Sequence, residues 1–238
     1  MAADLAGALS ELGARLRRGR ALHPRGRLLS GTLEVTGAGD LGVPVLDEPG
    51  RYEVIARLSK GGSLPGRLPD VLGLATRLPG PLDILLSTCG AAPWLLWPRA
   101  GFTAGPYSSV VPYLTHAGPV WLVAMPEGEN VPARPALLPE ALARGPLLFH
   151  LLAARRDAPA RHLATLTVRT TLPESTDLSF DPIRHGHPAL RIGGTLARLR
   201  RHAYGGSRRG RHARLDEGLS GAEPARASVE PARAADRL

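Results

Sequence analysis

The feature that most constrains the fold is a series of short apolar runs, most of them bounded by Gly, Pro or Asp. Runs of this length with these boundaries are typical of β-strands. Residues 88–118, rich in Pro, Gly and small side chains, divide the runs into two sets and predict a long connection with short helical turns. Two sets of about four strands favour an antiparallel barrel, which removes exposed sheet edges by closing. The predicted strands cover residues 28–36, 52–59, 72–78, 82–87, 120–125, 147–154, 164–171 and 190–192.

Segments that are predicted to be helical lie before, between and after these strands. The leucines between positions 5 and 16 recur at the spacing of one helical face, which predicts an amphipathic helix within residues 1–19. Residues 135–144 indicate an inserted helix, and residues 195–204, enclosed by Gly pairs, indicate a last helix. Residues 216–238 almost lack core-forming side chains and are predicted to be a disordered tail. The sequence therefore predicts one α+β domain over residues 20–215, a barrel of about eight strands with flanking helices.

The chain is strongly basic, with a formal net charge of +9, and Lys60 is its single lysine. The densest arginine clusters cover residues 15–27 and 198–214. Aromatic residues make up only 4% of the chain and leave few stacking platforms for single-stranded nucleic acid, so nucleic acid is not the expected partner. The guanidinium fork binds carboxylates and phosphates bidentately, so clustered arginines also suit smaller anionic ligands.

The start of the chain lacks a basic region followed by an apolar stretch, which argues against a signal peptide and predicts a cytoplasmic protein. Arg, Pro or Gly interrupts every apolar stretch before it reaches the roughly 18 residues of a membrane-spanning helix, so no transmembrane segment is expected. Cys89 is the single cysteine, so neither an intrachain disulfide nor an all-cysteine metal site can form. A reducing compartment fits these features.

Four segments in chain order carry a further pattern of Arg, His, Asp and Tyr. They are Arg20-Ala-Leu-His23-Pro-Arg25-Gly26 with the strand Gly31–Thr36, then Val54-Ile-Ala-Arg57-Leu-Ser59, then Pro69-Asp70 through Gly73-Leu-Ala75 to Leu82-Asp83-Ile84-Leu85, and finally Arg200-x-x-x-Tyr204 followed by Arg211. In this order and at these separations, they resemble the haem-dependent catalase superfamily over residues 20 to about 212. The resemblance implies a small catalase-like barrel that binds haem b, with a C-terminal proximal helix and without the long wrapping arms of larger catalases.

The resemblance also assigns the residues that would hold haem. Tyr204 matches the axial ligand of the iron, and an anionic tyrosinate is the axial ligand of catalase-type haem. Arg200 lies four residues earlier on the same helical face, where its charge would favour the phenolate. Arg20, Arg57 and Arg211 match the positions that neutralise the haem propionates through charge-assisted hydrogen bonds.

On the distal side, His23 matches the histidine that moves a proton between the peroxide oxygens, and Ser59 matches the serine that holds its imidazole. Ser87 stands where the family has an asparagine, and Leu86 replaces a glycine. Because serine is shorter than asparagine, it is expected to assist bound peroxide less well. The resemblance therefore implies a peroxidase acting on hydrogen peroxide or on organic or lipid hydroperoxides, rather than an efficient dismutase.

Two other function classes stay open at the level of sequence. A phosphodiesterase-type hydrolase on the same barrel would need a metal-binding carboxylate and histidine cluster, and Asp70, Asp83 and Asp181 form no such motif. A non-enzymatic module could use the basic surface to bind nucleic acid or another anion. The aromatic residues that flank haem in larger members have only Trp94, Trp97 and Phe102 as candidates. The oligomeric state is also open, with a homodimer as one alternative.

Overall fold

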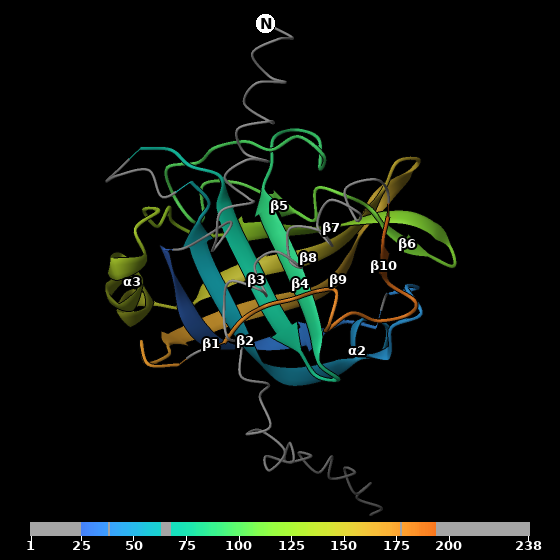
Figure 1. Cartoon of the computed structure of the whole chain (residues 1–238), viewed down its shortest axis with the longest axis horizontal. Helices are drawn as coiled ribbons and strands as arrows, with labels where there is room; N and C mark the ends of the chain where they lie inside the picture. The colour runs from blue at the N-terminus through green and yellow to red at the C-terminus, as the bar shows by residue number, and fades with distance from the viewer. Residues whose placement is uncertain (1–24, 38, 63–67, 177, 194–238) are drawn as a thin grey trace, which may run out of the picture.

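Within the residues that the structure describes, eight antiparallel strands close into a barrel (Figure 1). The computed structural model describes residues 25–37, 39–62, 68–176 and 178–193. The ring closes because β7 pairs with β8 and β9 pairs with β1, which confirms the predicted antiparallel barrel. The barrel strands are β1 (Arg25–Val35), β2 (Gly50–Lys60), β3 (Leu72–Leu78), β4 (Leu82–Thr88), β5 (Tyr107–Ser108), β7 (Gly118–Glu127), β8 (Leu147–Arg155) and β9 (Ala158–Thr171).

Leucine-rich inner positions fill this barrel. Side chains alternate between the two faces of a strand, and the even-numbered residues of β3 and β4 are buried in the core while the odd-numbered residues face outward. Leu58, Leu74 and Leu86 are paired directly across β2, β3 and β4 and form one inner row. Each such leucine stabilises the fold by roughly 1.5–3 kcal/mol through removal of its side chain from water.

An aromatic contact completes the core. Tyr107 meets Phe149 edge to face, with ring centroids 6.1 Å apart. The Tyr107 hydroxyl donates a hydrogen bond of 2.7 Å to the Phe102 carbonyl oxygen. Complete burial raises the pKa of the Tyr107 phenol far above its ordinary value, so this group is a neutral donor at physiological pH.

Helices in the described residues are short. The predicted helix over 135–144 exists as a 3₁₀ turn, η1 (Pro135–Leu137), that continues into α3 (Leu138–Arg144). The predicted helical turns within residues 88–118 are wrong, because the structure has no helix there and places strand β5 and strand β6 (Tyr113–Thr115) instead. Strands this short show no periodicity in the sequence and exist because neighbouring strands supply hydrogen-bond partners.

The sheet extends beyond the ring at one edge. Strand β6 pairs with β7, and β10 (Arg191–Ile192) pairs with β6. One further helix, α2 (Pro44–Asp47), follows β1 and was not predicted; the Asp47 carboxylate accepts hydrogen bonds from the Leu41 and Val43 backbone N–H groups at 3.0 and 2.8 Å.

The predicted helices within residues 1–19 and 195–204 and the predicted tail over 216–238 lie outside the described residues. In the part of the chain that is described, no helix combines the length and the apolar character needed to cross a membrane.

Candidate functional site

The predicted catalytic residues Ser59 and Ser87 lie in one row across the outer face of the barrel. The register pairs Gly26 with Ser59, Ser59 with Gly73, Gly73 with Ser87, and Ser87 with Ser108, from β1 to β5. Directly paired residues of antiparallel strands carry their side chains on the same face. We call these five residues the serine–glycine row. None of its side chains is longer than serine; Ser59, Gly73 and Ser108 are buried, whereas Gly26 and Ser87 are partly exposed.

Arg57 lies beside this row on the same strand and face as Ser59. It pairs with Leu28 and Ala75, so its flanking side chains are apolar. A Cβ atom added to Gly26 would lie 2.7 Å from Arg57 Cζ, so the guanidinium extends over the glycine backbone and requires the absence of a side chain there. Burial lowers the pKa of the Arg57 guanidinium, yet the ordinary pKa of arginine is so high that the group stays charged. The face therefore carries a partly buried cation next to small side chains.

The two serines of the predicted site differ in their surroundings. Ser59 is buried, and its hydroxyl donates a long hydrogen bond of 3.4 Å to the Gly73 carbonyl oxygen. Ser87 is partly exposed. Leu86, which replaces the family's glycine, points into the core and leaves the outer face to Ser87.

The structure thus brings together Arg57, Ser59 and Ser87 from positions that the sequence had assigned to one site. The other predicted site residues lie outside the described residues: Arg20, His23, Arg200, Tyr204 and Arg211. Their roles stay predictions. Among the described residues, no group of three or more His, Cys, Asp or Glu side chains is placed to hold a metal ion.

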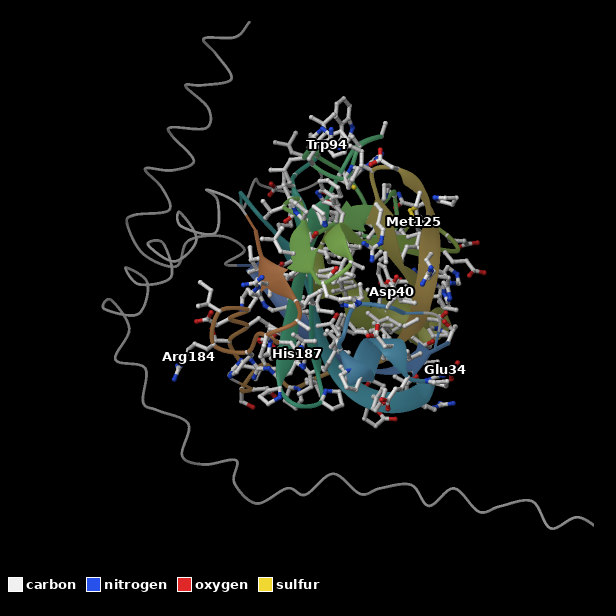
Figure 2. All side chains as sticks on the ribbon, turned by 90° about the vertical axis from the view of Figure 1, so that its right-hand side faces the viewer. Glu34, Asp40, Trp94, Met125, Arg184 and His187 are labelled. Atoms are coloured by element: carbon white, nitrogen blue, oxygen red, sulfur yellow. The ribbon has the colours of Figure 1, made fainter. Side chains whose placement is uncertain are left out.

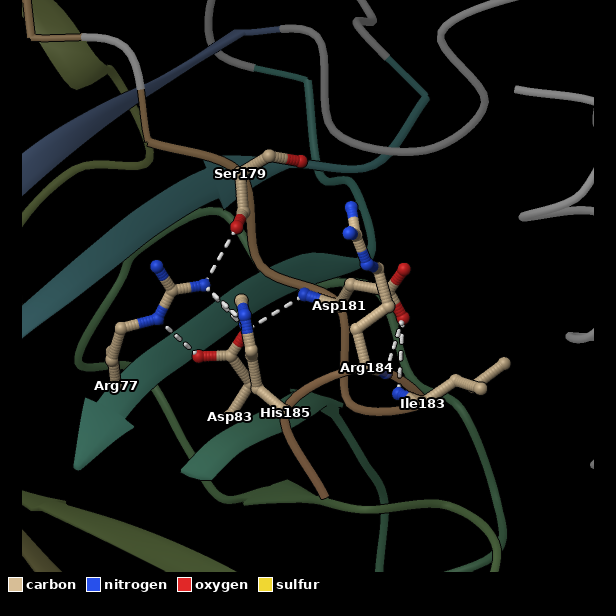
Figure 3. A network of polar contacts seen from close by, with 7 residues as sticks. All are labelled: Arg77, Asp83, Ser179, Asp181, Ile183, Arg184 and His185. Atoms are coloured by element: carbon tan, nitrogen blue, oxygen red, sulfur yellow. Dashed lines mark hydrogen bonds and ion pairs between the residues drawn. The ribbon is translucent and has the colours of Figure 1, made fainter. Parts of the chain in front are cut away.

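Sequence reasoning missed a polar network at the other end of β3 and β4 (Figure 3). Gly80, at a φ of 87° in the turn between these strands, lets the chain reverse and sets Arg77 directly opposite Asp83. Arg77 Nε and Nη2 donate to the two Asp83 carboxylate oxygens, each at 2.7 Å. His185 Nδ1 lies 3.0 Å from Asp83 Oδ2 and 2.8 Å from Arg77 Nη2. The Asp83 side chain is fully buried, so this ion pair is shielded from water.

The network holds the segment after β9 in place across β3 and β4. Asp83 Oδ2 accepts a 2.7 Å hydrogen bond from the Asp181 backbone N–H, and Arg77 Nη2 donates one of 2.7 Å to the Ser179 carbonyl oxygen. The Asp83 backbone N–H donates to the His185 carbonyl oxygen at 2.8 Å. Residues 179–185 are therefore held against the barrel before the chain enters β10 (Figure 3). The one signal in the sequence was a charged residue, Asp83, next to an apolar run.

A second polar cluster, on β7, β8 and β9, contains two histidines. His150 Nε2 lies 2.6 Å from a Glu127 carboxylate oxygen, and the Thr165 hydroxyl lies 3.4 Å from both His150 Nδ1 and His162 Nε2. The two imidazole rings are 5.6 Å apart. Partial burial and, second, the charge of His150 lower the pKa of His162.

This lowered pKa predicts a small acid sensitivity. The unfolded chain binds a proton at His162 at higher pH than the folded chain does. The contribution of the neutral His162 imidazole to the free energy of unfolding is therefore complete above the unfolded pKa of about 6.5. It is lost as the pH falls through the lower pKa of the folded chain. His162→Gln should reduce the loss of thermal midpoint between about pH 7 and pH 5 by only about 1–2 °C, because the imidazole is only partly buried. Thermal unfolding followed across this pH range checks the prediction, with His116→Gln, at an exposed position, as the control. An equal effect of both changes would contradict it.

No protein-family model and no curated protein sequence matches the chain. Solved structures do match it. A fungal catalase has a TM-score of 0.57 and 13% identity over 84% of this chain, and a bacterial catalase has a TM-score of 0.57 and 11% identity over the same share. The matches cover 60% and 58% of those two catalase chains, so this chain spans less than two thirds of their length. At such low identity the likeness establishes the fold alone, and the chain folds as a catalase-like antiparallel β-barrel.

Proposed function

We propose that this chain is a haem-binding, catalase-like protein that acts as a peroxidase on hydrogen peroxide or on organic or lipid hydroperoxides. The observation that carries the proposal is the placement of Arg57 beside the serine–glycine row on the outer face of a catalase-like barrel. Ser59 and Ser87, assigned from separate strands of the sequence, fall into that one row.

The described residues fit a haem group in shape and charge. Haem is a flat apolar ring with two carboxylates. The serine–glycine row carries only short side chains, and the neighbouring outward positions Leu28, Ala75 and Leu85 are apolar. Arg57 adds a partly buried cation that suits a propionate. In this proposal Arg20 and Arg211 hold the propionates with Arg57, and Tyr204, assisted by Arg200, binds the iron.

When bound, haem supplies the ferric iron at which a peroxide reacts. The chain's own residues then bind the peroxide and move its proton. A hydroxyl can accept hydrogen bonds while it donates one, so Ser59 can keep its bond to the Gly73 carbonyl and still accept the imidazole N–H of His23. That contact would fix the tautomer in which the other ring nitrogen takes and returns the proton. Ser87 contributes a single short hydroxyl on the same row.

Arg57→Leu should weaken haem retention about tenfold or more, since a hydrogen bond to a charged group contributes about 1.5–3 kcal/mol. Arg51→Leu is the matched control, because Arg51 lies on the same strand and face but is exposed and paired with Glu34 at 2.9 Å. Haem content and dissociation rate are measured for both variants, and thermal midpoints separate loss of haem from loss of fold. Equal effects at both positions would instead favour a diffuse basic surface.

The distal residues give a second test of the proposal. His23→Ala should leave the Soret band largely in place and slow the reaction with peroxide by about 10²-fold or more, the usual scale for a positioned proton-transfer group. Ser87→Asn should raise hydrogen peroxide turnover, because Leu86 points into the core and leaves room for the longer side chain. Oxygen release and oxidation of a reducing co-substrate are followed together. An unchanged rate in the His23 variant would remove His23 from the mechanism.

A further inference from the structure

Four consecutive large apolar side chains are exposed at one end of the barrel. Trp94, Leu95, Leu96 and Trp97 are 53%, 48%, 36% and 51% exposed. Figure 2 shows Trp94 at one end of the described part of the chain. We call these four residues the apolar ridge. The other exposed large apolar residues of the described chain, Leu68, Leu114 and Met125, each stand alone in the sequence. Contiguous apolar exposure of this kind marks an interaction site.

The backbone of the ridge is ordered although its side chains stay outside the core. The Gly90 N–H donates to the Leu95 carbonyl oxygen at 2.8 Å, and the Trp97 N–H donates to the Thr88 carbonyl oxygen at 3.0 Å. The Ser108 hydroxyl donates to the Pro93 carbonyl oxygen, which fixes the loop against β5. Because the loop is already fixed, binding through the ridge would not have to order it first.

Two arginines stand near the ridge, Arg99 two residues after Trp97 and Arg156 beside Trp94, and exposed Asp157 follows Arg156 on its turn. No Asp or Glu occurs between Asp83 and Glu127, a stretch that includes the whole ridge. The Arg156 guanidinium, on the turn between β8 and β9, lies 5.6 Å from the centre of the Trp94 ring. The chain as a whole is also basic, at +9. A partner of this surface must therefore accept apolar side chains and present negative charge beside them.

We propose that the apolar ridge docks on the surface of an anionic phospholipid bilayer. Tryptophan favours the boundary between headgroups and acyl chains because its ring is apolar and its indole N–H is polar. The leucines would enter the acyl boundary, and Arg156 would lie at the level of the lipid phosphates. Each of the four side chains is about one third to one half exposed, which suits shallow insertion at the headgroup level and requires no complementary groove.

Docking would also orient the candidate site. Pro93, at the base of the ridge, contacts Ser108, the last member of the serine–glycine row. The ridge would thus hold that end of the row at the lipid surface. One consequence rests on the proposed function. If the chain is a peroxidase, the substrates nearest to it would be hydroperoxides of lipid acyl chains. The docking itself requires no haem.

Sedimentation with vesicles of phosphatidylcholine, with and without phosphatidylglycerol, tests the proposal on the full chain. The wild type should sediment with the anionic vesicles, and its tryptophan emission should shift to shorter wavelength, since Trp94 and Trp97 are exposed while Trp121 is buried. Leu96→Ser combined with Trp97→Ser should lower binding at least about tenfold. Leu114→Ser combined with Met125→Ser is the matched control, with 39% and 40% exposure outside the ridge, and should bind as the wild type does.

If the apolar ridge binds something other than an anionic bilayer, these measurements give different results. Equal binding by both double variants, or binding that salt abolishes without any emission shift, would assign vesicle binding to general basic charge and overturn the proposal. A wild-type dimer that the ridge variant turns into a monomer, with no vesicle binding, would assign the ridge to a second copy of the chain. Quenching of wild-type emission by brominated lipid supports insertion without relying on the folding of any variant. All these measurements can fail or succeed whether or not the protein binds haem.

Discussion

Full-length protein expressed with added haem precursor should show a ferric Soret band, and Tyr204→Phe should abolish or shift that band. The change removes only the phenol oxygen, which is the proposed anionic ligand, and leaves the aromatic ring of the side chain in place. Because the axial ligand tunes the haem directly, a large spectral change is expected. Visible absorption spectra of purified wild type and variant provide the measurement.

Tyr52→Phe is the matched control, since it makes the same chemical change at a partly exposed position of β2. It should leave the spectrum unchanged. If the wild type were colourless after supply of haem precursor, the proposed function would be wrong, but the conclusion about the fold would stand. A normal Soret band in Tyr204→Phe would mean that another residue binds the iron.

Asp83→Ala should lower the free energy of unfolding by about 3–5 kcal/mol, because it leaves the Arg77 guanidinium and the Asp181 N–H without their buried acceptor. In a domain of this size the thermal midpoint should fall by about 6–20 °C. Asp157→Ala is the control, because Asp157 is exposed on the turn between β8 and β9. Circular dichroism followed during heating measures both variants.

A paired substitution shows whether the ion pair itself is the cause. Arg77→Leu combined with Asp83→Leu removes both charges, so it should recover part of the stability lost in Asp83→Ala. The recovery should be incomplete, because the Asp181 N–H still lacks its acceptor. If Asp83→Ala were as mild as Asp157→Ala, residues 179–185 would not depend on this network for their attachment to the barrel.

The sequence alone determined most of the strands and the class of fold. The apolar runs and their Gly, Pro and Asp boundaries are local signals, and the strand predicted over residues 72–78 has these bounds in the structure. Two sets of short strands were enough to predict closure, because an open sheet would expose its edges. The assignment of Arg57, Ser59 and Ser87 to one site also came from the sequence, through the resemblance of its segments.

Only the tertiary structure decided how those residues meet. The serine–glycine row runs from Gly26 to Ser108 across strands whose register depends on barrel closure, and a shift of one residue would turn each side chain to the other face. Strand β5 is too short to show a period and exists through its partners β4 and β7. His185 reaches Asp83 from 102 residues away, and the fold leaves the four apolar side chains of the ridge partly exposed although their sequence alone is typical of a core. Local sequence sets which face of a strand is apolar, whereas contacts between distant residues depend on pairings that no local pattern encodes.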